Sequence, residues 1–391
     1  MKRVAHSPRE ALPQIAQGYG FGFTVIDGKT YWDESAYYQF TLAQIENDIE
    51  KPTQDINTML LEAADKVIAS DKLLRQFAIP ESAWAEIRRS WDRDEPTVYG
   101  RIDLCYDGKS PAKLYEANYD TPTSLFEAAV FQWDWLESQF PHLDQYNTIH
   151  EKLVEQWRRV KSQVKGNTIH FAGVLESVED SFTLEYLLDT AVQAGFEARL
   201  IDIADIGIGN LPNTGMLGKI GFSGDKVFTD PDDEVIENLF KLYPWEHLLR
   251  EEFAKYIDKT PTRWIEPTWK AVISNKAILP LLWDMYPNHP NLIESRYHDD
   301  PNNVPEGFVL KPFFSREGAG VVIPGIDEAE QEEEHGGYII QRYTPLPKFG
   351  DSYAVIGSWT VGGEACGIGI REDASLITKN TSRFLPHLIK G

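Results

Sequence analysis

The sequence is poor in several features, and each shortage excludes a class of protein. Only two cysteines occur, Cys105 and Cys366, so neither a disulfide framework nor a cysteine metal knuckle is available. No stretch approaches the roughly 20 consecutive apolar residues that a membrane-spanning helix needs. The start carries Lys2 and Arg3 without an apolar segment after them, so we expect no secretory signal. We therefore expect a cytoplasmic protein without a membrane partner.

Basic residues are also scarce. There are 38 Lys and Arg against 61 Asp and Glu, which gives a net charge of -23. Nucleic-acid binding requires a basic surface that neutralises phosphates, so we expect no nucleic-acid partner. The acidic balance is compatible with a cationic substrate.

The common phosphate-binding motifs are missing as well. No Walker loop is present, and Gly207-Ile208-Gly209 lacks the flanking pattern of a dinucleotide fingerprint. Any nucleotide must therefore be bound in another way. The 391 residues, rich in Trp and Tyr, predict a packed globular chain of two or three domains.

Among the residues that are present, one pair of segments is the most informative. Residues 99–106 and 113–118 flank an Asp-Gly-Lys-Ser-Pro turn and predict a β-hairpin. Alternate side chains of a strand share one face, so symmetric closure brings polar groups together. The facing pairs are then Asp103 with Glu116 and Arg101 with Asn118.

Two carboxylates, an amide and a guanidinium on one sheet face have two explanations. Oxygen donors on a rigid sheet suit Mg²⁺, which keeps some positions for phosphate and water. The adjacent arginine suits negative charge that develops during a reaction. A cross-strand ion-pair cluster is the alternative.

Other segments add candidate sites. Thr121 and Thr123 precede a helix expected over 125–140, where hydroxyls either cap the helix or bind an anion. A strand–helix–strand pattern over 168–201 predicts a parallel sheet with Glu179 and Asp180 beyond a strand end, suited to an amine or simply solvated. Residues 232–257 are expected to be largely helical.

The C-terminal part predicts a nucleotide-binding surface. Lys270 stands in the first turn of an expected helix, where a cation opposes the helix dipole. A strand over 307–312, a glycine loop over 315–320 and a returning strand form a pattern that lays backbone amides over polyphosphate or makes an ordinary turn. Residues 338–343 form a strand whose apolar end can border an adenine, and strands over 353–361 and 365–371 complete an antiparallel set.

These residues together resemble the synthetase half of glutathionylspermidine synthase and its stand-alone relatives, acid–amine ligases with an ATP-grasp fold. The resemblance covers nearly the full length. Its anchors in chain order are Arg101-Ile102-Asp103, Glu116-Ala117-Asn118, Trp269-Lys270-Ala271, Leu310-Lys311-Pro312 with Gly318, Gln341, and Gly369-Ile370-Arg371.

The resemblance implies a role for each candidate residue. Asp103, Glu116 and Asn118 would hold two Mg²⁺, and Arg101 would stabilise the transition state. The acid substrate would contact Thr121 and Thr123, and Glu179 and Asp180 match the amine-binding corner loosely. The ATP-binding residues would be Arg101, Ile102, Asp103, Lys270, Lys311, Gly318, Gln341, Arg342, Tyr343, Arg371, Leu376, Ile377 and Thr378.

The resemblance also implies the fold and the activity. We expect a mixed α/β chain with an ATP-grasp fold after an α/β substrate domain. The expected segments are 1–165 with the hairpin and helices, 166–215 as the substrate-side unit, and 216–391 as the nucleotide-binding lobes. The expected reaction joins a small-molecule or short-peptide carboxylate to an amine, such as a polyamine or amino acid, through an acyl phosphate. No amidase domain is expected.

Two other classes of function remain open from the sequence. A nucleotide-binding regulator without turnover would be expected to shed metal ligands, which are retained here. A carbohydrate-active enzyme with paired carboxylates would leave Lys270, Lys311 and the glycine loop unexplained.

Overall fold

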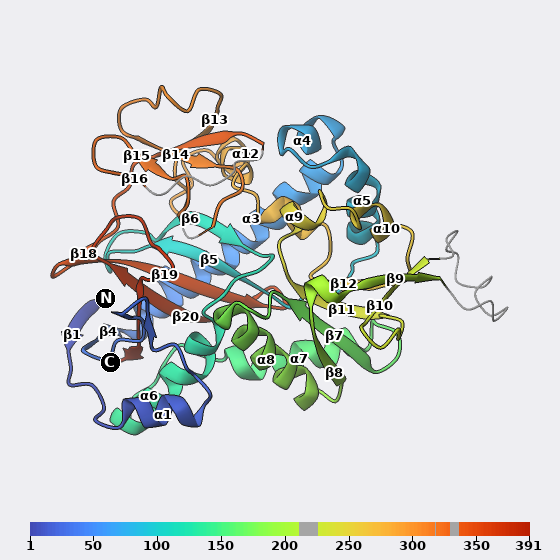
Figure 1. The fold of residues 1–391 in the computed structure, drawn as a ribbon. Coiled ribbons are helices and arrows are strands. Elements are labelled where there is room, and N and C mark those ends of the chain that lie inside the picture. The colour runs from blue at the N-terminus through green and yellow to red at the C-terminus, as the bar shows by residue number, and fades with distance from the viewer. Residues whose placement is uncertain (211–225, 317, 329–335) are drawn as a thin grey trace.

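The structure is a computed structural model that describes residues 1–210, 226–316, 318–328 and 336–391 (Figure 1). The expected segment boundary at 215/216 lies outside the described residues, as do Glu317 of the glycine loop and most of the acidic run 327–334. None of the helices in these described ranges is long and apolar enough to cross a membrane.

A large antiparallel sheet occupies the centre of the molecule (Figure 1). It joins the expected hairpin to strands from the end of the chain, so residues about 250 positions apart in sequence become neighbours. Its strands are β21 (Arg383–Leu385), β20 (Glu364–Asp373), β19 (Ser352–Val361), β5 (Tyr99–Cys105) and β6 (Lys113–Asn118), with β18 (Lys348–Phe349) paired to β19.

A second antiparallel sheet lies above the hairpin in the view of Figure 1. The expected strands over 307–312 and 338–343 are confirmed at its centre. Its strands are, in order, β13 (Ser295–His298), β17 (Tyr338–Arg342), β14 (Phe308–Pro312), β15 (Val322–Ile323) and β16 (Asp327–Glu328).

The third sheet is parallel and confirms the strand–helix–strand prediction over 168–201. Its strands are, in order, β12 (Arg263–Ile265), β11 (Asn238–Leu242), β7 (Thr168–Gly173) and β8 (Glu197–Asp202). The expectation that 232–257 is largely helical is wrong, because β11 lies inside it. This strand is buried along its whole length between β7 and β12, so its sequence lacks the alternation that marks a half-exposed strand.

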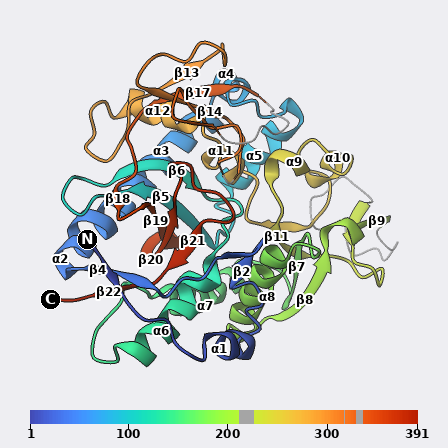
Figure 2. The same cartoon turned by 60° about the vertical axis from the view of Figure 1, so that its left-hand side comes forward.

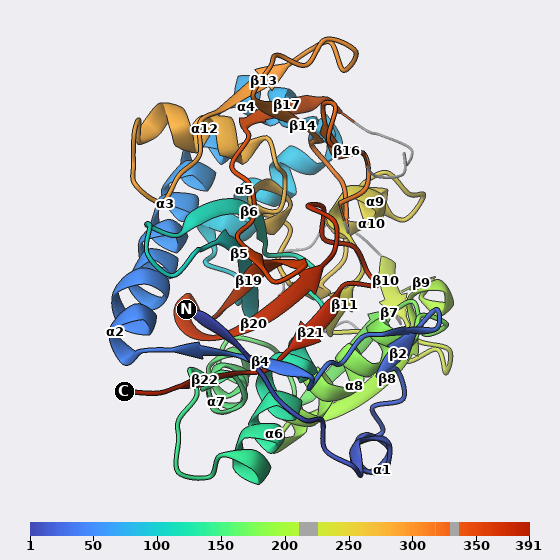
Figure 3. The ribbon, with the colours of Figure 1, turned by 90° about the vertical axis from the view of Figure 1, so that its left-hand side faces the viewer.

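Smaller sheets involve both ends of the chain, and the N- and C-termini lie near one another (Figures 2 and 3). Strand β4 pairs with strands from both ends. These small sheets contain β1 (Lys2–Ala5), β4 (Ala36–Phe40) and β22 (His387–Ile389), then β2 (Val25–Ile26) with β3 (Lys29–Thr30), and β9 (Gly207–Asn210) with β10 (Lys226–Thr229).

Helices cover both faces of the central sheet. Helix α3 packs its apolar stripe on one face, and its Thr53 hydroxyl hydrogen-bonds Ser358 of β19 at 2.7 Å. Helix α7 contacts the same sheet through Ile149 against Gly367. The α-helices are α1 (Leu12–Gly18), α2 (Leu42–Gln44), α3 (Lys51–Ile68), α4 (Asp71–Gln76), α5 (Trp84–Asp92), α6 (Gln132–Gln139), α7 (Ile149–Lys161), α8 (Val178–Gln193), α9 (Trp245–Leu248), α10 (Ala254–Ile257), α11 (Lys270–Ile273) and α12 (Ile278–Met285).

Short turns of other helix types complete the description. Two are wide π-helical turns that lead into α3 and α6, and two are short 3₁₀ turns. They are Ile45–Glu50, Glu127–Phe131, Glu81–Ala83 and Ile203–Asp205.

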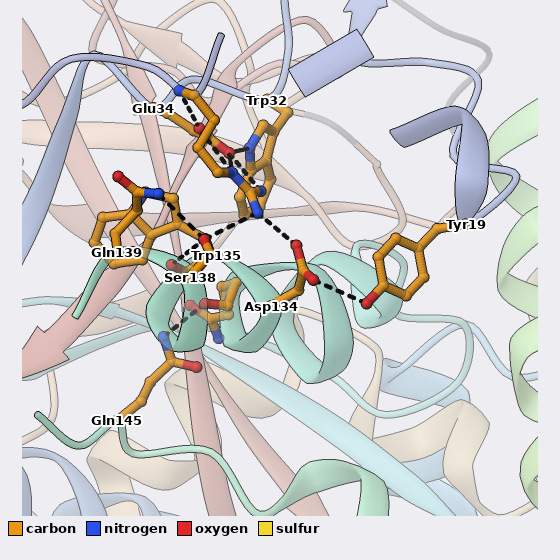
Figure 4. A network of polar contacts seen from close by, with 10 residues as sticks. Tyr19, Trp32, Glu34, Asp134, Trp135, Ser138, Gln139 and Gln145 are labelled. Atoms are coloured by element: carbon orange, nitrogen blue, oxygen red, sulfur yellow. Dashed lines mark hydrogen bonds and ion pairs between the residues drawn. The ribbon is translucent and has the colours of Figure 1, made fainter. Parts of the chain in front are cut away.

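The N-terminal segment is fastened to α6 by charged groups (Figure 4). Arg9 donates to Glu34 at 2.7 Å and to Asp134 of α6 at 2.5 Å, and the hydroxyl of Tyr19 donates to Asp134 at 3.0 Å. The indole of Trp32 donates to the same Glu34 carboxylate at 2.9 Å. This network holds the segment that carries β2 and β3.

The sheets do not follow the three segments expected from sequence. The central sheet takes strands from 1–165 and from 216–391, and the parallel sheet takes strands from 166–215 and from 216–391. The chain therefore passes between the central sheet and the parallel sheet several times. The hairpin of β5 and β6 belongs to the central sheet.

Candidate active site

The hairpin forms with the expected register. Asp103 lies opposite Glu116 and Arg101 opposite Asn118, with a bulge after Asp103. Because side chains alternate, Ile102 points to the other face and is buried in the core under α3. The side chain of Ile102 therefore does not enter the site, contrary to the role implied for it.

Polar contacts join the four side chains into one cluster. Arg101 donates to Asp103 through Nε at 2.7 Å and through Nη2 at 3.1 Å, a bidentate ion pair. The Nδ2 of Asn118 lies 3.2 Å from Asp103 and 3.3 Å from Glu116. The site thus has two carboxylates and an amide within reach of one another, on a rigid sheet.

Two lysines act on Glu116. Lys276 Nζ lies 3.1 Å from its carboxylate, and Lys311 stands nearby. Burial alone would raise the pKa of Glu116, but these two ammonium groups outweigh it and lower that pKa to about 2. Burial raises the pKa of Asp103, although Arg101 opposes this. Glu116 is therefore the carboxylate most firmly held as an anion.

A mainly apolar cavity opens on one side of the hairpin. It lies between the central sheet and the second antiparallel sheet, and Lys311 stands at its polar end. Lys311 donates to Gln341 at 2.7 Å and to the carbonyl of Tyr115 at 3.3 Å. The residues expected to bind the nucleotide that line this cavity are Asp103, Lys311, Gly318, Gln341, Arg342, Tyr343, Leu376, Ile377 and Thr378.

Gly318 has a clear structural reason to be glycine at the edge of this cavity. Its φ is +77°, and a Cβ there would lie 3.0 Å from the carbonyl oxygen of Thr378 and would collide with Ile377. The loop thus approaches the opposite wall closely, a contact that the glycine pattern alone did not reveal.

A second, more polar cleft opens beside this cavity, on the same face of the hairpin. Thr121, Thr123, Glu179 and Asp180 all line it, as the resemblance implied for an acid and an amine. Arg371, which was expected at the nucleotide, lines this cleft and not the apolar cavity. Asp103 and Glu116 line both this cleft and the apolar cavity. The hairpin carboxylates therefore form part of the wall shared by the two, together with Gly318 and Thr378.

The threonines of this cleft do not cap a helix. The Thr121 hydroxyl accepts a hydrogen bond from Arg316 at 2.5 Å, and the Thr123 carbonyl accepts one from Arg101 at 2.9 Å. Glu179 and Asp180 lie in the first turn of α8, which Ser177 caps. Burial, reinforced by the neighbouring Glu179, raises the pKa of Asp180 to about 6.

Lys270 does not reach either cavity. Its ammonium forms a buried ion pair with Glu266 at 2.5 Å and donates to the carbonyl of Tyr99 at 2.6 Å. Glu266 is thus the counter-charge that explains a cation in the first turn of a helix.

Lys276 stands at the site instead, and it was missed from sequence. It follows α11 by three residues, binds Glu116 and donates to the carbonyl of Ser315 at 2.8 Å. Both Lys270 and Lys276 are buried, so only their tertiary partners distinguish them. The sole local signal was a second lysine six residues downstream of the first.

The donor set fits Mg²⁺ bound together with a phosphate ligand. Asp103 and Glu116 offer hard oxygens on adjacent strands, and Asn118 would offer its Oδ1 after rotation of the amide, whose Nδ2 now faces both carboxylates. Within the described residues there is no cluster of three or more His, Cys, Asp or Glu side chains suited to a metal. A magnesium ion here would take its remaining positions from phosphate and water, which is the usual arrangement for this ion.

Comparison with known sequences identifies the family to which this chain belongs. The sequence profile described as glutathionylspermidine synthase preATP-grasp matches residues 3–390. The chain belongs to this family. The structure and the family match together confirm the expected mixed α/β chain with an ATP-grasp-type fold.

Three relatives show how the length of the chain compares. A protein of Haemophilus influenzae, named provisionally as an acid–amine ligase, is 39% identical over 408 residues that span 99% of both chains. A trypanothione synthetase of Crithidia fasciculata is 30% identical, over 86% of this chain and 54% of that protein. A bifunctional glutathionylspermidine synthetase/amidase of Escherichia coli is 25% identical, over 91% of this chain and 60% of that protein. Two of these relatives are therefore much longer than the part that matches.

Proposed function

We propose that this protein is an ATP-dependent carboxylate–amine ligase that forms an amide bond through an acyl phosphate. The observation that supports this most strongly is the position of Asp103 and Glu116 in the wall shared by both cavities. A phosphate held against these residues faces the nucleotide on one side and an acid substrate on the other. The ligase and synthetase names of the relatives agree with this proposal.

The nucleotide would occupy the apolar cavity. Gln341 to Tyr343 with Leu376 would border the adenine, and Lys311 and Lys276 would bind the phosphates. Burial lowers the pKa of Lys311 to about 8, with Glu116 opposing, so the ammonium form prevails at neutral pH. Two Mg²⁺ held by Asp103, Glu116 and Asn118 would neutralise phosphate charge when bound.

The reaction would then take place in two steps at the shared wall. A carboxylate oxygen of the acid attacks the γ-phosphorus of ATP, the bond to the β-phosphate oxygen breaks, and an acyl phosphate and ADP result. The lone pair of the amine then attacks the acyl carbon, phosphate leaves, and the nitrogen loses a proton. Phosphoryl transfer requires mainly positioning and charge neutralisation.

Arg101 is suited to the charge that develops in both steps. Its guanidinium is half-buried and fixed by Asp103 and by the Thr123 carbonyl, so it needs little reorganisation. Thr121 and Arg316 would bind the carboxylate of the acid, because they already hydrogen-bond each other across the cleft. Glu179 and Asp180 would receive the amine.

The test is a search for the condensation product. The protein is incubated with ATP, Mg²⁺ and pools of acids and amines, and masses equal to acid plus amine minus water are sought, together with ADP. A product that requires both ATP and a substrate pair supports the proposal. ADP release without any condensed product, across broad pools, would contradict it.

A further inference from the structure

Beyond the general reaction, the substrate cleft indicates what kind of amine it accepts. We propose that the amine is a monoamine with a single positive charge and an apolar chain beyond it, rather than a polyamine. This inference rests on the proposed function. It concerns the outer part of the cleft, between α8 and the β2–β3 turn.

The negative charge available to an amine is confined to one corner. Four carboxylates line the cleft in addition to the hairpin pair. Asp120 forms an ion pair with Lys241 and accepts from the backbone N–H of Trp245 at 2.7 Å. Glu246 lies 3.5 Å from Arg316. Of these four carboxylates, only the adjacent Glu179 and Asp180 have no ion pair within the described parts of the chain, so they form a single site for an ammonium group.

Next to this corner the wall is apolar. Val178 directly precedes Glu179 and is 63% exposed, and Val25 of β2 is 55% exposed. Both line the cleft, together with Phe23 and Ile26. We call Phe23, Val25, Ile26 and Val178 the apolar rim. Exposed aliphatic side chains beside a ligand cleft gain free energy when an apolar group covers them.

The apolar rim is held in place by the segment behind it. Phe23 makes an edge contact with Phe182 of α8, with ring centroids 5.5 Å apart. The hydroxyl of Tyr31 donates to buried Glu127 at 2.5 Å, and Tyr19 is fixed to Asp134 in the network of Figure 4. These contacts therefore fix the apolar rim in place, both in the N-terminal segment and on α8.

Charge and burial together decide between the two kinds of amine. A second ammonium, several bonds from the first, would lie against the apolar rim, where the described residues that line the cleft offer no further unpaired carboxylate to receive it. It would also approach the cationic side chains of Arg316 and Arg371, which line the same cleft. Moving an ammonium from water to such a place is unfavourable, whereas a methyl group there is favourable.

Two probes of equal chain length isolate this difference. n-Pentylamine and 1,5-diaminopentane share one ammonium and five carbons and differ only in the distal group. We expect the full chain, titrated by calorimetry near pH 7.5, to bind n-pentylamine about tenfold more tightly than the diamine. Equal or tighter binding of the diamine, or no binding of either, would overturn the inference.

Variants locate the preference. Val178→Asp should reduce or reverse the ratio of the two affinities, because it places a carboxylate on the apolar rim. Val192→Asp is the matched control, since Val192 is 47% exposed at the far end of α8 and does not line the cleft. Glu179→Gln should weaken both probes. If Val192→Asp changes the ratio as much as Val178→Asp does, the rim is not responsible.

The proposed function and this inference fail in different ways. Titration of the amines uses neither ATP nor an acid, so it reports on the cleft alone. Loss of the predicted preference, with ATP-dependent condensation intact, would contradict only the inference. The predicted preference without condensation would contradict only the ligase proposal.

Discussion

The two cavities that share the hairpin carboxylates are built in different ways. The apolar cavity takes its walls from strands of two sheets and from the loops that join them, with Lys311 at its polar end. Apart from the hairpin, the substrate cleft takes its walls from loops, the first turn of α8 and the N-terminal segment. A nucleotide presents the same groups in every enzyme that uses it, so a rigid surface serves. Substrates differ, and the parts that contact them lie on elements that can change without disturbing the sheets.

Neutralising a carboxylate that lines both cavities should have the largest effect on turnover. We expect Glu116→Gln to lower kcat by about 10²–10³-fold, because it removes the carboxylate nearest to both lysines and to the proposed metal. Steady-state ADP release measures this loss. Glu46→Gln, an exposed carboxylate on another element, is the control. Normal turnover and normal Mg²⁺ dependence in Glu116→Gln would remove the hairpin from the mechanism.

Arg101→Lys should separate chemistry from nucleotide binding. Lysine keeps the charge but cannot form the bidentate pair with Asp103, so we expect kcat to fall by about 10²-fold. The dissociation constant of ATP, measured by calorimetry, should stay within about twofold of the wild-type value. A parallel loss of ATP affinity would show that Arg101 serves the nucleotide side rather than the reaction.

The two lysines of 270–276 offer a sharper contrast between a binding role and a structural one. Lys276→Met should weaken ATP binding by about tenfold, because a cation near the phosphates is lost. Lys270→Met should instead lower the free energy of unfolding by about 3–5 kcal/mol, since it leaves Glu266 buried without its counter-charge. ATP titration and chemical denaturation of both variants give the comparison.

The double variant Lys270→Met with Glu266→Gln controls for misfolding. It removes both charges of the buried pair, so part of the lost stability should return. If Lys270→Met abolishes ATP binding while its stability is unchanged, the assignment of the two lysines is reversed.

The smallest effect that we predict is a pH dependence on the substrate side. Asp180 has a pKa of about 6, so it is protonated below pH 6 and charged above it. Affinity for a cationic amine should therefore rise several-fold as pH increases from 5 to 7. Asp180→Asn should flatten this dependence. Because ATP binding relies on other groups, its affinity should change little over the same interval.

The hairpin could be predicted from sequence because its information is local. The turn signal fixes the register, and alternation then places Asp103 opposite Glu116, as the structure confirms. At Gly318 only the positive φ is local, because the atoms that exclude a Cβ belong to Ile377 and Thr378, far along the chain. Alternation likewise showed, in retrospect, that the side chain of Ile102 points away from the site.

Features that depend on contacts between residues far apart in the sequence could not be predicted from the sequence. Strand β11 was taken for helix because it is buried on all sides and therefore lacks a period of two. Sequence analysis selected Lys270 because the helix-dipole argument considers only the position of a lysine within its helix. In the folded chain Lys270 pairs with Glu266 and Lys276 with Glu116, and these partners distinguish the two lysines. The apolar rim combines Val25 with Val178, which only the folded chain brings together.

The central claim is that the hairpin carboxylates and two lysines bind magnesium triphosphate together. A crystal structure with Mg²⁺ and a non-hydrolysable ATP analogue tests it directly. We predict the γ-phosphate between Lys276 and Lys311, with metal density at Asp103 and Glu116 and the adenine beside Gln341. Triphosphate bound in another cavity, or density at the hairpin without phosphate contact to either lysine, would contradict the account.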